Sequence, residues 1–129
     1  MITKDLSLVN WPNQSGEYKV VQFDNGDEVY LRFGNDPEHP LGYGDFHEFI
    51  LERFAKEIDV ECLEIQVRGD DISILPDDIS YKLVGAGRCN LDVTAKSAAF
   101  FGSSRDYSKD ISSDHIAKLA LKFPDWQIK

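Results

Sequence analysis

Alternating apolar and polar residues predict a pair of strands early in the chain. Over residues 18–33, apolar residues alternate with polar ones on both sides of residues 24–27. This is the pattern of strands that turn one face toward a core. Between them, Asn25 and Gly26 form the dipeptide that best supplies the positive φ angles of a two-residue turn. The segment is therefore predicted to be a β-hairpin.

A helical period follows a segment rich in proline and glycine. Residues 34–44 contain two prolines and three glycines, which break regular structure and predict a surface loop. After it, four apolar residues recur at steps of four: Phe46, Ile50, Phe54 and Ile58. With Asp45 as a suitable N-cap, this spacing predicts an amphipathic helix that ends near Asp59.

A second helix is predicted near the end of the chain. It begins at Ser112 or Ser113, whose hydroxyl groups suit an N-cap, and stops before Pro124. His115 is expected on its outer face. Its apolar positions are Ile116, Leu119 and Ala120.

The remaining apolar runs predict strands in hairpins. They are residues 63–67, 72–75, 81–84 and 98–101. Gly85 and Gly87 are predicted to permit a bulge or a close approach beside a strand. Because strands follow one another instead of alternating with helices, we expect an α+β fold: a single domain with a mostly antiparallel or mixed sheet of five to six strands and two main helices. The domain would span residues 1–129, with residues 1–14 as an N-terminal extension.

Charge and composition narrow the classes of partner. A formal net charge of -9 disfavours binding to nucleic acid and to anionic membranes. The first residues lack the pattern of a secretory signal, and no apolar run could span a bilayer. We therefore expect a cytoplasmic monomer. Cys62 and Cys89 lack metal-ligand spacing and are expected as reduced thiols, and no acidic pair has the spacing of a calcium loop, so no metal site is predicted.

His47 is the strongest candidate for chemistry. It lies on the first turn of the predicted helix, where unpaired N–H groups and partial positive charge disfavour protonation of an imidazole. A neutral ring nitrogen is what a nucleophile or a general base requires at neutral pH. The alternative is a capping or partly buried histidine with a structural role.

Two further segments could bind an anion. Arg88 follows Gly85 and Gly87, a pair that lacks the third glycine of a dinucleotide fingerprint and the helix after it. Ser103 and Ser104 leave the end of a predicted strand, where hydroxyl and backbone N–H groups could line a shallow anion site. The sequence contains no Gly-x-Ser-x-Gly elbow, which disfavours a serine hydrolase.

Five short segments, taken in their order along the chain, carry a resemblance to a known family. They are residues 16–19 (Gly-Glu-Tyr-Lys), 42–47 (Gly-Tyr-Gly-Asp-Phe-His), 85–88 (Gly-Ala-Gly-Arg), 100–104 (Phe-Phe-Gly-Ser-Ser) and 122–126 (Lys-Phe-Pro-Asp-Trp). Their order and spacing resemble the phosphohistidine phosphatase family, small enzymes grouped with the Janus and Ocnus proteins. The resemblance implies a metal-independent protein phosphatase without cofactors. Its substrates would be proteins that carry phosphohistidine, with phospholysine as a further candidate.

The resemblance also assigns roles to residues. His47 would attack phosphorus directly or take a proton from an attacking water, and the resemblance leaves both open. Lys19 would bind the phosphoryl group, with support from Arg88. The serine segment would complete the phosphate and substrate site, and its residues are Ser103, Ser104, Arg105 and Asp106.

The chain departs from the family pattern at two places. Leu41 stands where the family commonly has an arginine, so one cation expected near the phosphate is absent. Arg105 and Asp106 replace small or apolar residues, adding a cation and an anion to the rim. These departures leave an alternative, a non-catalytic module of the Janus type that binds phosphoproteins or has a regulatory role. An RNA-cleaving site built from His47, Lys19 and Arg88 is disfavoured by the net charge.

Overall fold

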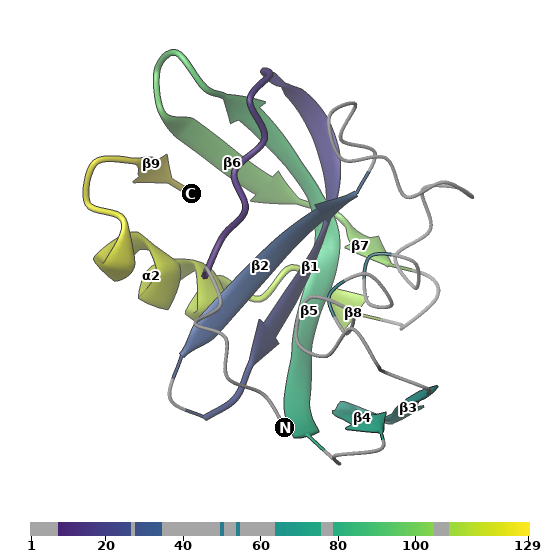
Figure 1. Ribbon diagram of the computed structural model, residues 1–129. Helices are drawn as coiled ribbons and strands as arrows, with labels where there is room; N and C mark the ends of the chain where they lie inside the picture. Colours follow the sequence, from purple (N-terminus) through teal and green to yellow (C-terminus); the bar gives the residue numbers. More distant parts are fainter. Residues whose placement is uncertain are drawn as a thin grey trace.

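Strands dominate the described part of the chain (Figure 1). The computed structural model describes residues 8–26, 28–34, 50, 54, 64–75, 79–104 and 109–129. In chain order its elements are β1 (Gly16–Asp24), β2 (Val29–Gly34), β3 (Glu64–Arg68), β4 (Asp71–Leu75), β5 (Ile79–Asp92), β6 (Ser97–Phe101), β7 (Ser103–Ser104), β8 (Lys109–Asp110), α2 (Ser113–Lys122) and β9 (Gln127–Ile128).

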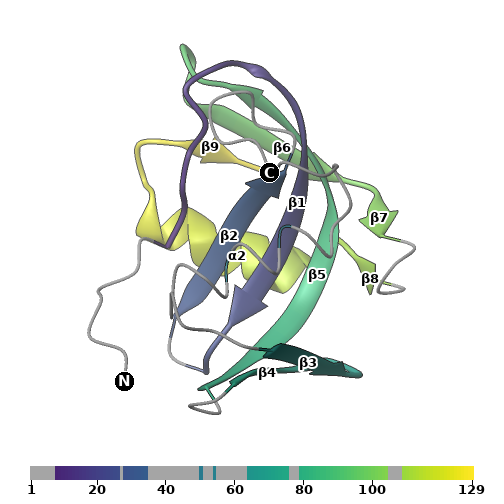
Figure 2. The same ribbon diagram turned by 45° about the vertical axis from the view of Figure 1, so that its right-hand side comes forward.

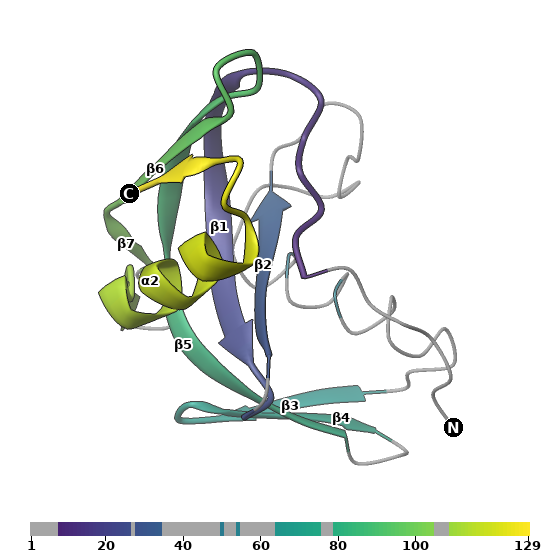
Figure 3. The same cartoon turned by 90° about the vertical axis from the view of Figure 1, so that its left-hand side faces the viewer.

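Seven of the strands form one curled, mixed sheet, and β7 and β8 form a separate antiparallel pair. The order of the large sheet is β2-β1-β5-β4-β3, with β6 joined to β5 and β9 joined to β6. Neighbours are antiparallel except β6 and β9, which are parallel. The 14-residue β5 pairs with β4 at its start and with β6 at its end (Figures 1 and 3). A single small α+β domain is thus confirmed. The expected five to six strands correspond to β1–β6, and β9 adds a short seventh.

The hairpins predicted from alternation are confirmed for β1–β2, β3–β4 and β5–β6. The first turn differs in detail from the prediction. Gly26 has a positive φ of 94°, whereas Asn25 does not appear among the non-glycine residues with positive φ. Instead, the Asn25 backbone N–H donates to the Glu28 carbonyl at 3.2 Å, and the Asn25 side chain accepts from the Glu28 N–H at 2.8 Å. Asn25 therefore closes the turn through its side chain.

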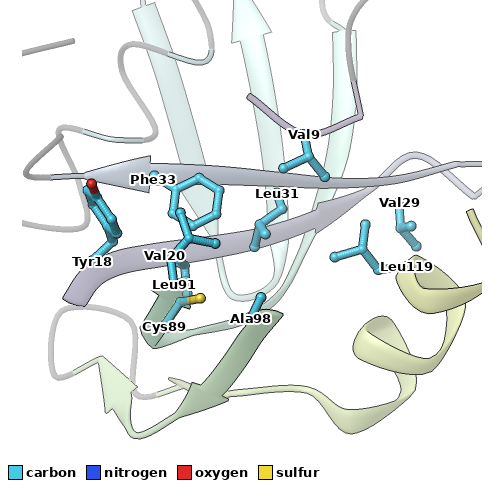
Figure 4. Close-up of a cluster of buried hydrophobic side chains, with 10 residues drawn as sticks. All are labelled: Val9, Tyr18, Val20, Val29, Leu31, Phe33, Cys89, Leu91, Ala98 and Leu119. Carbon is cyan, nitrogen blue, oxygen red and sulfur yellow. The ribbon is translucent and has the colours of Figure 1, made fainter. Parts of the chain in front are cut away.

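One face of the sheet packs under α2. Alternate residues of the strands turn inward here, as strand periodicity requires, and Leu119 of α2 packs on them. The buried cluster consists of Val9, Tyr18, Val20, Val29, Leu31, Phe33, Cys89, Leu91, Ala98 and Leu119 (Figure 4). Burial raises the pKa of the Cys89 thiol to about 12, so it stays protonated. At its rim, Trp11 stacks on Trp126 with ring centroids 4.0 Å apart.

The opposite face carries an aromatic cluster. Phe54 stacks on Phe23 with centroids 4.5 Å apart and meets the edge of Tyr81 at 5.1 Å. The buried Arg32 guanidinium lies 5.0 Å from the centroid of the same Phe54 ring. Phe54 and Ile50 both have helical backbone, but the rest of the helix predicted over residues 45–59 lies outside the described residues. Within the described ranges α2 is the one helix with defined bounds, so the expectation of two main helices is not matched. None of the described helices is long and apolar enough to cross a bilayer.

His115 is buried, so the prediction that it lies on the outer face of its helix was wrong. Its Nε2–H donates to the carbonyls of Tyr30 at 2.9 Å and Phe23 at 3.1 Å, because a carbonyl can only accept. Nδ1 must then accept from the Gln22 side-chain amide at 3.1 Å. Gln22 Oε1 in turn accepts from the backbone N–H of Ser112, the N-cap of α2, at 2.8 Å. With its polar atoms satisfied, the ring can occupy the core and fix the start of α2 on β1.

This arrangement predicts that acid weakens the fold through His115. Burial lowers the pKa of His115, against hydrogen bonds to the Tyr30 and Phe23 carbonyls that raise it. Because the unfolded chain binds the proton more tightly, this part of the stability is complete above the unfolded pKa of about 6.5 and is lost as the pH falls below it, by no more than about 1.4 kcal/mol per unit. In urea unfolding at pH 7.5 and pH 5, the wild type should lose more free energy of unfolding than His115→Gln, which cannot take up this proton. Equal losses would contradict the assignment.

Candidate functional site

Two cations predicted from distant parts of the sequence lie side by side on the sheet. Lys19 of β1 is directly opposite Arg88 of β5 in the antiparallel register. Directly opposite residues have Cβ atoms about 4.5–5.5 Å apart and share one face. Lys19 is half-buried and Arg88 is exposed. The fold therefore creates a doubly cationic position that no single motif contains.

Lys19 is also bordered by the segment that follows His47 in the sequence. Its other cross-strand partner is Gly34 of β2. A Cβ atom added at Gly34 would lie 2.6 Å from Ile50 Cδ1 and 3.7 Å from Lys19 Cβ. Because Gly34 has no side chain, Ile50 can pack directly on the β1–β2 strand pair beside Lys19. Ile50 follows His47 by three residues in the sequence.

The serine segment lies beside β5, in the gap between its pairings with β4 and β6. Figure 2 shows β7 and β8 next to β5, on the side away from β1. A Cβ at Gly87 would lie 2.6 Å from the Phe101 carbonyl oxygen, and one at Gly85 would lie 2.9 Å from the Asp110 carbonyl oxygen. The register between β1 and β5 also shifts beside Gly85. Both predicted roles of these glycines, the bulge and the close approach, are confirmed.

Ser104 has an unusual environment. Its side chain is 2 % exposed, and its Oγ has no hydrogen-bond partner among the described residues. Ser103, its neighbour in β7, is exposed. Leaving a buried hydroxyl unsatisfied costs about 1–3 kcal/mol, so native proteins rarely do so without a reason. A ligand oxygen that reached Ser104 Oγ would recover this cost.

Several predicted site residues lie outside the described residues: His47, Leu41, Arg105 and Asp106. The structure therefore brings together Lys19 and Arg88 and sets the two serines next to β5. The convergence of these groups on His47 stays a prediction. Within the described ranges, no cluster of three or more histidine, cysteine or acidic residues could hold a metal ion.

Glu17 is a residue of this site that sequence reasoning missed. Its Oε2 accepts a hydrogen bond from Arg88 Nη1 at 3.0 Å. Glu17 lies two residues before Lys19 in β1, so strand alternation puts both on the same face. The contact between Glu17 and Arg88 can be recognised only when the β1–β5 register is known, and the sequence alone does not define that register. The guanidinium of Arg88 thus already has a carboxylate partner.

A cavity of about 540 Å³ lies at the other end of β1 and differs in chemistry. Its described lining includes Asp24, Asp71, Ser73, Ser80, Tyr81 and Lys82. The Lys82 ammonium is ion-paired with the Asp71 carboxylate. Because carboxylates outnumber cations here, this cavity suits an anion less well than the face that carries Lys19 and Arg88.

The described geometry offers a pair of cations, Lys19 and Arg88, on one face of the sheet. Such a pair can hold the oxygens of a tetrahedral anion, since phosphate recognition relies on charge-assisted hydrogen bonds. Comparison with known proteins found no matching family model and no similar curated protein.

Proposed function

We propose that the protein is a metal-independent phosphatase that hydrolyses phosphohistidine in other proteins. The observation that carries this proposal is the direct cross-strand pairing of Lys19 and Arg88. Like charges directly opposite each other destabilise a sheet, and the Glu17 carboxylate offsets part of this repulsion through its hydrogen bond from Arg88. A phosphoryl group that competes with Glu17 for Arg88 suits the same pair, because its oxygens can accept hydrogen bonds from both cationic side chains.

In the proposed reaction His47 acts on the phosphorus and the cations act on its oxygens. As nucleophile, a neutral His47 nitrogen bonds to phosphorus while the P–N bond to the substrate imidazole breaks and that imidazole takes up a proton. Water then cleaves the new P–N bond and releases phosphate. As general base, His47 instead takes the proton of the attacking water. In both cases Lys19 and Arg88 stabilise charge on the equatorial oxygens, which is the main contribution that a protein makes to phosphoryl transfer.

Two further observations support this assignment. Ile50, which follows His47 by three residues in the sequence, packs against Gly34 beside Lys19. Ser104 Oγ is buried without a partner in the described part of the chain, on a strand that lies next to β5. A phosphoryl oxygen would supply the missing hydrogen bond.

The test is release of phosphate by the purified protein. A peptide with phosphohistidine and the same peptide with phosphoserine are incubated with the protein, with and without EDTA. We expect release from the phosphohistidine peptide alone, at a rate that EDTA does not change. Binding of the phosphohistidine peptide without release would favour the non-catalytic module, and hydrolysis of phosphoserine at an equal rate would contradict the P–N specificity.

Lys19→Ala is expected to weaken substrate binding far more than folding. Loss of a charge-assisted hydrogen bond to phosphate should raise KM about tenfold, whereas truncation of a half-buried strand lysine should cost less than about 1 kcal/mol of stability. Steady-state kinetics and urea unfolding measure the two effects. Lys118→Ala, which removes the same charge from an exposed site on α2, is the control. A tenfold rise in KM for both variants would point to overall charge instead.

A further inference from the structure

Three charged side chains lie next to one another on the face proposed to bind phosphate: the cations Lys19 and Arg88 and the carboxylate Glu17. Lys19 and Arg88 are direct partners, and Glu17 reaches diagonally across the strand pair to Arg88. The side chains of Glu17 and Arg88 are 49 % and 46 % exposed. Because water and solutes reach both groups, their ion pair can exchange partners without opening the fold.

A phosphoryl group that binds Arg88 competes with the Glu17 carboxylate. Both are anions, and their mutual repulsion disfavours simultaneous binding to one guanidinium. When the phosphoryl group takes Arg88, Glu17 gives up its hydrogen bond from that guanidinium. A cation on the substrate, next to the phosphoryl group, would restore the lost ion pair.

We infer that Glu17 makes the site selective for phosphoryl groups carried beside a positive charge, so that the substrates are phosphorylated segments rich in lysine or arginine. This inference rests on the proposed function of the same site. The partner exchange replaces the ion pair between Glu17 and Arg88 by two others, phosphoryl to Arg88 and substrate cation to Glu17. A substrate with acidic neighbours would leave Glu17 facing more negative charge.

Two other features favour a basic substrate. The net charge of -9 attracts cationic segments over long range. Phe101 of β6 is directly opposite Arg88, and its side chain is 40 % exposed. The face of an exposed aromatic ring attracts ammonium and guanidinium groups. A substrate lysine or arginine thus finds a carboxylate on one side of Arg88 and an aromatic ring on the other.

The experiment compares Glu17→Gln with Glu28→Gln. Glu28 is a matched control because it forms a similar exposed ion pair, with Lys122 at 3.2 Å, near the other end of β1. The probes are two peptides with a central phosphohistidine, flanked by lysines in one and by glutamates in the other, together with inorganic phosphate. Dissociation constants are measured by NMR titration, so that turnover is not required.

The wild type should bind the lysine-flanked peptide more tightly than the glutamate-flanked one. Glu17→Gln should reduce this preference about three- to fivefold, the range of one exposed ion pair, and should bind inorganic phosphate more tightly than the wild type. Glu28→Gln should keep the wild-type preference. An unchanged preference in Glu17→Gln, equal changes in both variants, or no binding of any probe would overturn the inference. Peptides that bind with this preference but are never hydrolysed would contradict the phosphatase and leave the role of Glu17 standing.

Discussion

Replacing His47 with alanine is expected to lower the rate of phosphohistidine hydrolysis about a thousandfold, with little change in substrate affinity. The reason is that positioned general bases and nucleophiles typically contribute factors of about 10² to 10⁴, while the phosphoryl group would still be held by Lys19 and Arg88. Single-turnover measurements of phosphate release give the rate. Circular dichroism and urea unfolding establish that the variant is folded.

The control is His39→Ala, a histidine of the segment rich in proline and glycine before the predicted helix. It should retain the wild-type rate. If His47→Ala also retained a rate within a few-fold of the wild type, the proposed role of His47 would be refuted. Quenching the reaction in alkali, where phosphohistidine survives, then distinguishes the two mechanisms. Labelled phosphate attached to the protein identifies a nucleophile, and its absence during turnover favours a general base.

Gly85→Ala is expected to destabilise the fold by about 3 kcal/mol, because overpacking and a displaced hydrogen bond add together. The new Cβ would lie 2.0 Å from Gln22 Oε1, 2.8 Å from the Ser112 nitrogen and 2.9 Å from the Asp110 carbonyl oxygen. The side chain of Gln22 could rotate away, but it would then abandon the Ser112 N–H that it accepts from. The other two atoms belong to the backbone and can separate only if the chain before α2 moves off β5. Urea unfolding measures the loss.

Gly16→Ala is the matched control, since its Cβ would have no neighbour closer than 3.8 Å. It should change the free energy of unfolding by less than about 0.5 kcal/mol. The double variant Gly85→Ala, Gln22→Ala removes the side-chain overlap and keeps the backbone overlap. Full recovery of stability in this double variant would show that the backbone of residues 110–112 is not the obstacle.

Local sequence signals predicted the strands and the final helix well, because they depend on contacts between near neighbours. Alternation located β1 and β2, and a serine before an apolar repeat located the start of α2 at Ser113. His115 shows where such signals fail. The helical pattern of polar and apolar residues predicts that His115 is on the surface. Its burial depends instead on hydrogen bonds to the carbonyls of Phe23 and Tyr30, which are remote in the sequence.

The sequence named candidate residues for the site one by one, but it did not predict how Lys19 and Arg88 are arranged. Lys19 and Arg88 were identified from separate segments, and their direct pairing follows from the β1–β5 register, which the bulge beside Gly85 modifies. Glu17 was missed for the same reason, since an exposed strand carboxylate has no recognisable pattern until its partner across the sheet is known.

The stacking of Trp11 on Trp126 provides an intrinsic optical signal. The sequence contains two tryptophans, and both belong to this stack, in which the indole planes are 5° apart. Closely stacked indoles couple their electronic transitions and quench each other's emission. Detachment of the segment before β1 from the chain after α2 would therefore brighten the fluorescence, and the docking of these two segments can be followed in real time without a dye.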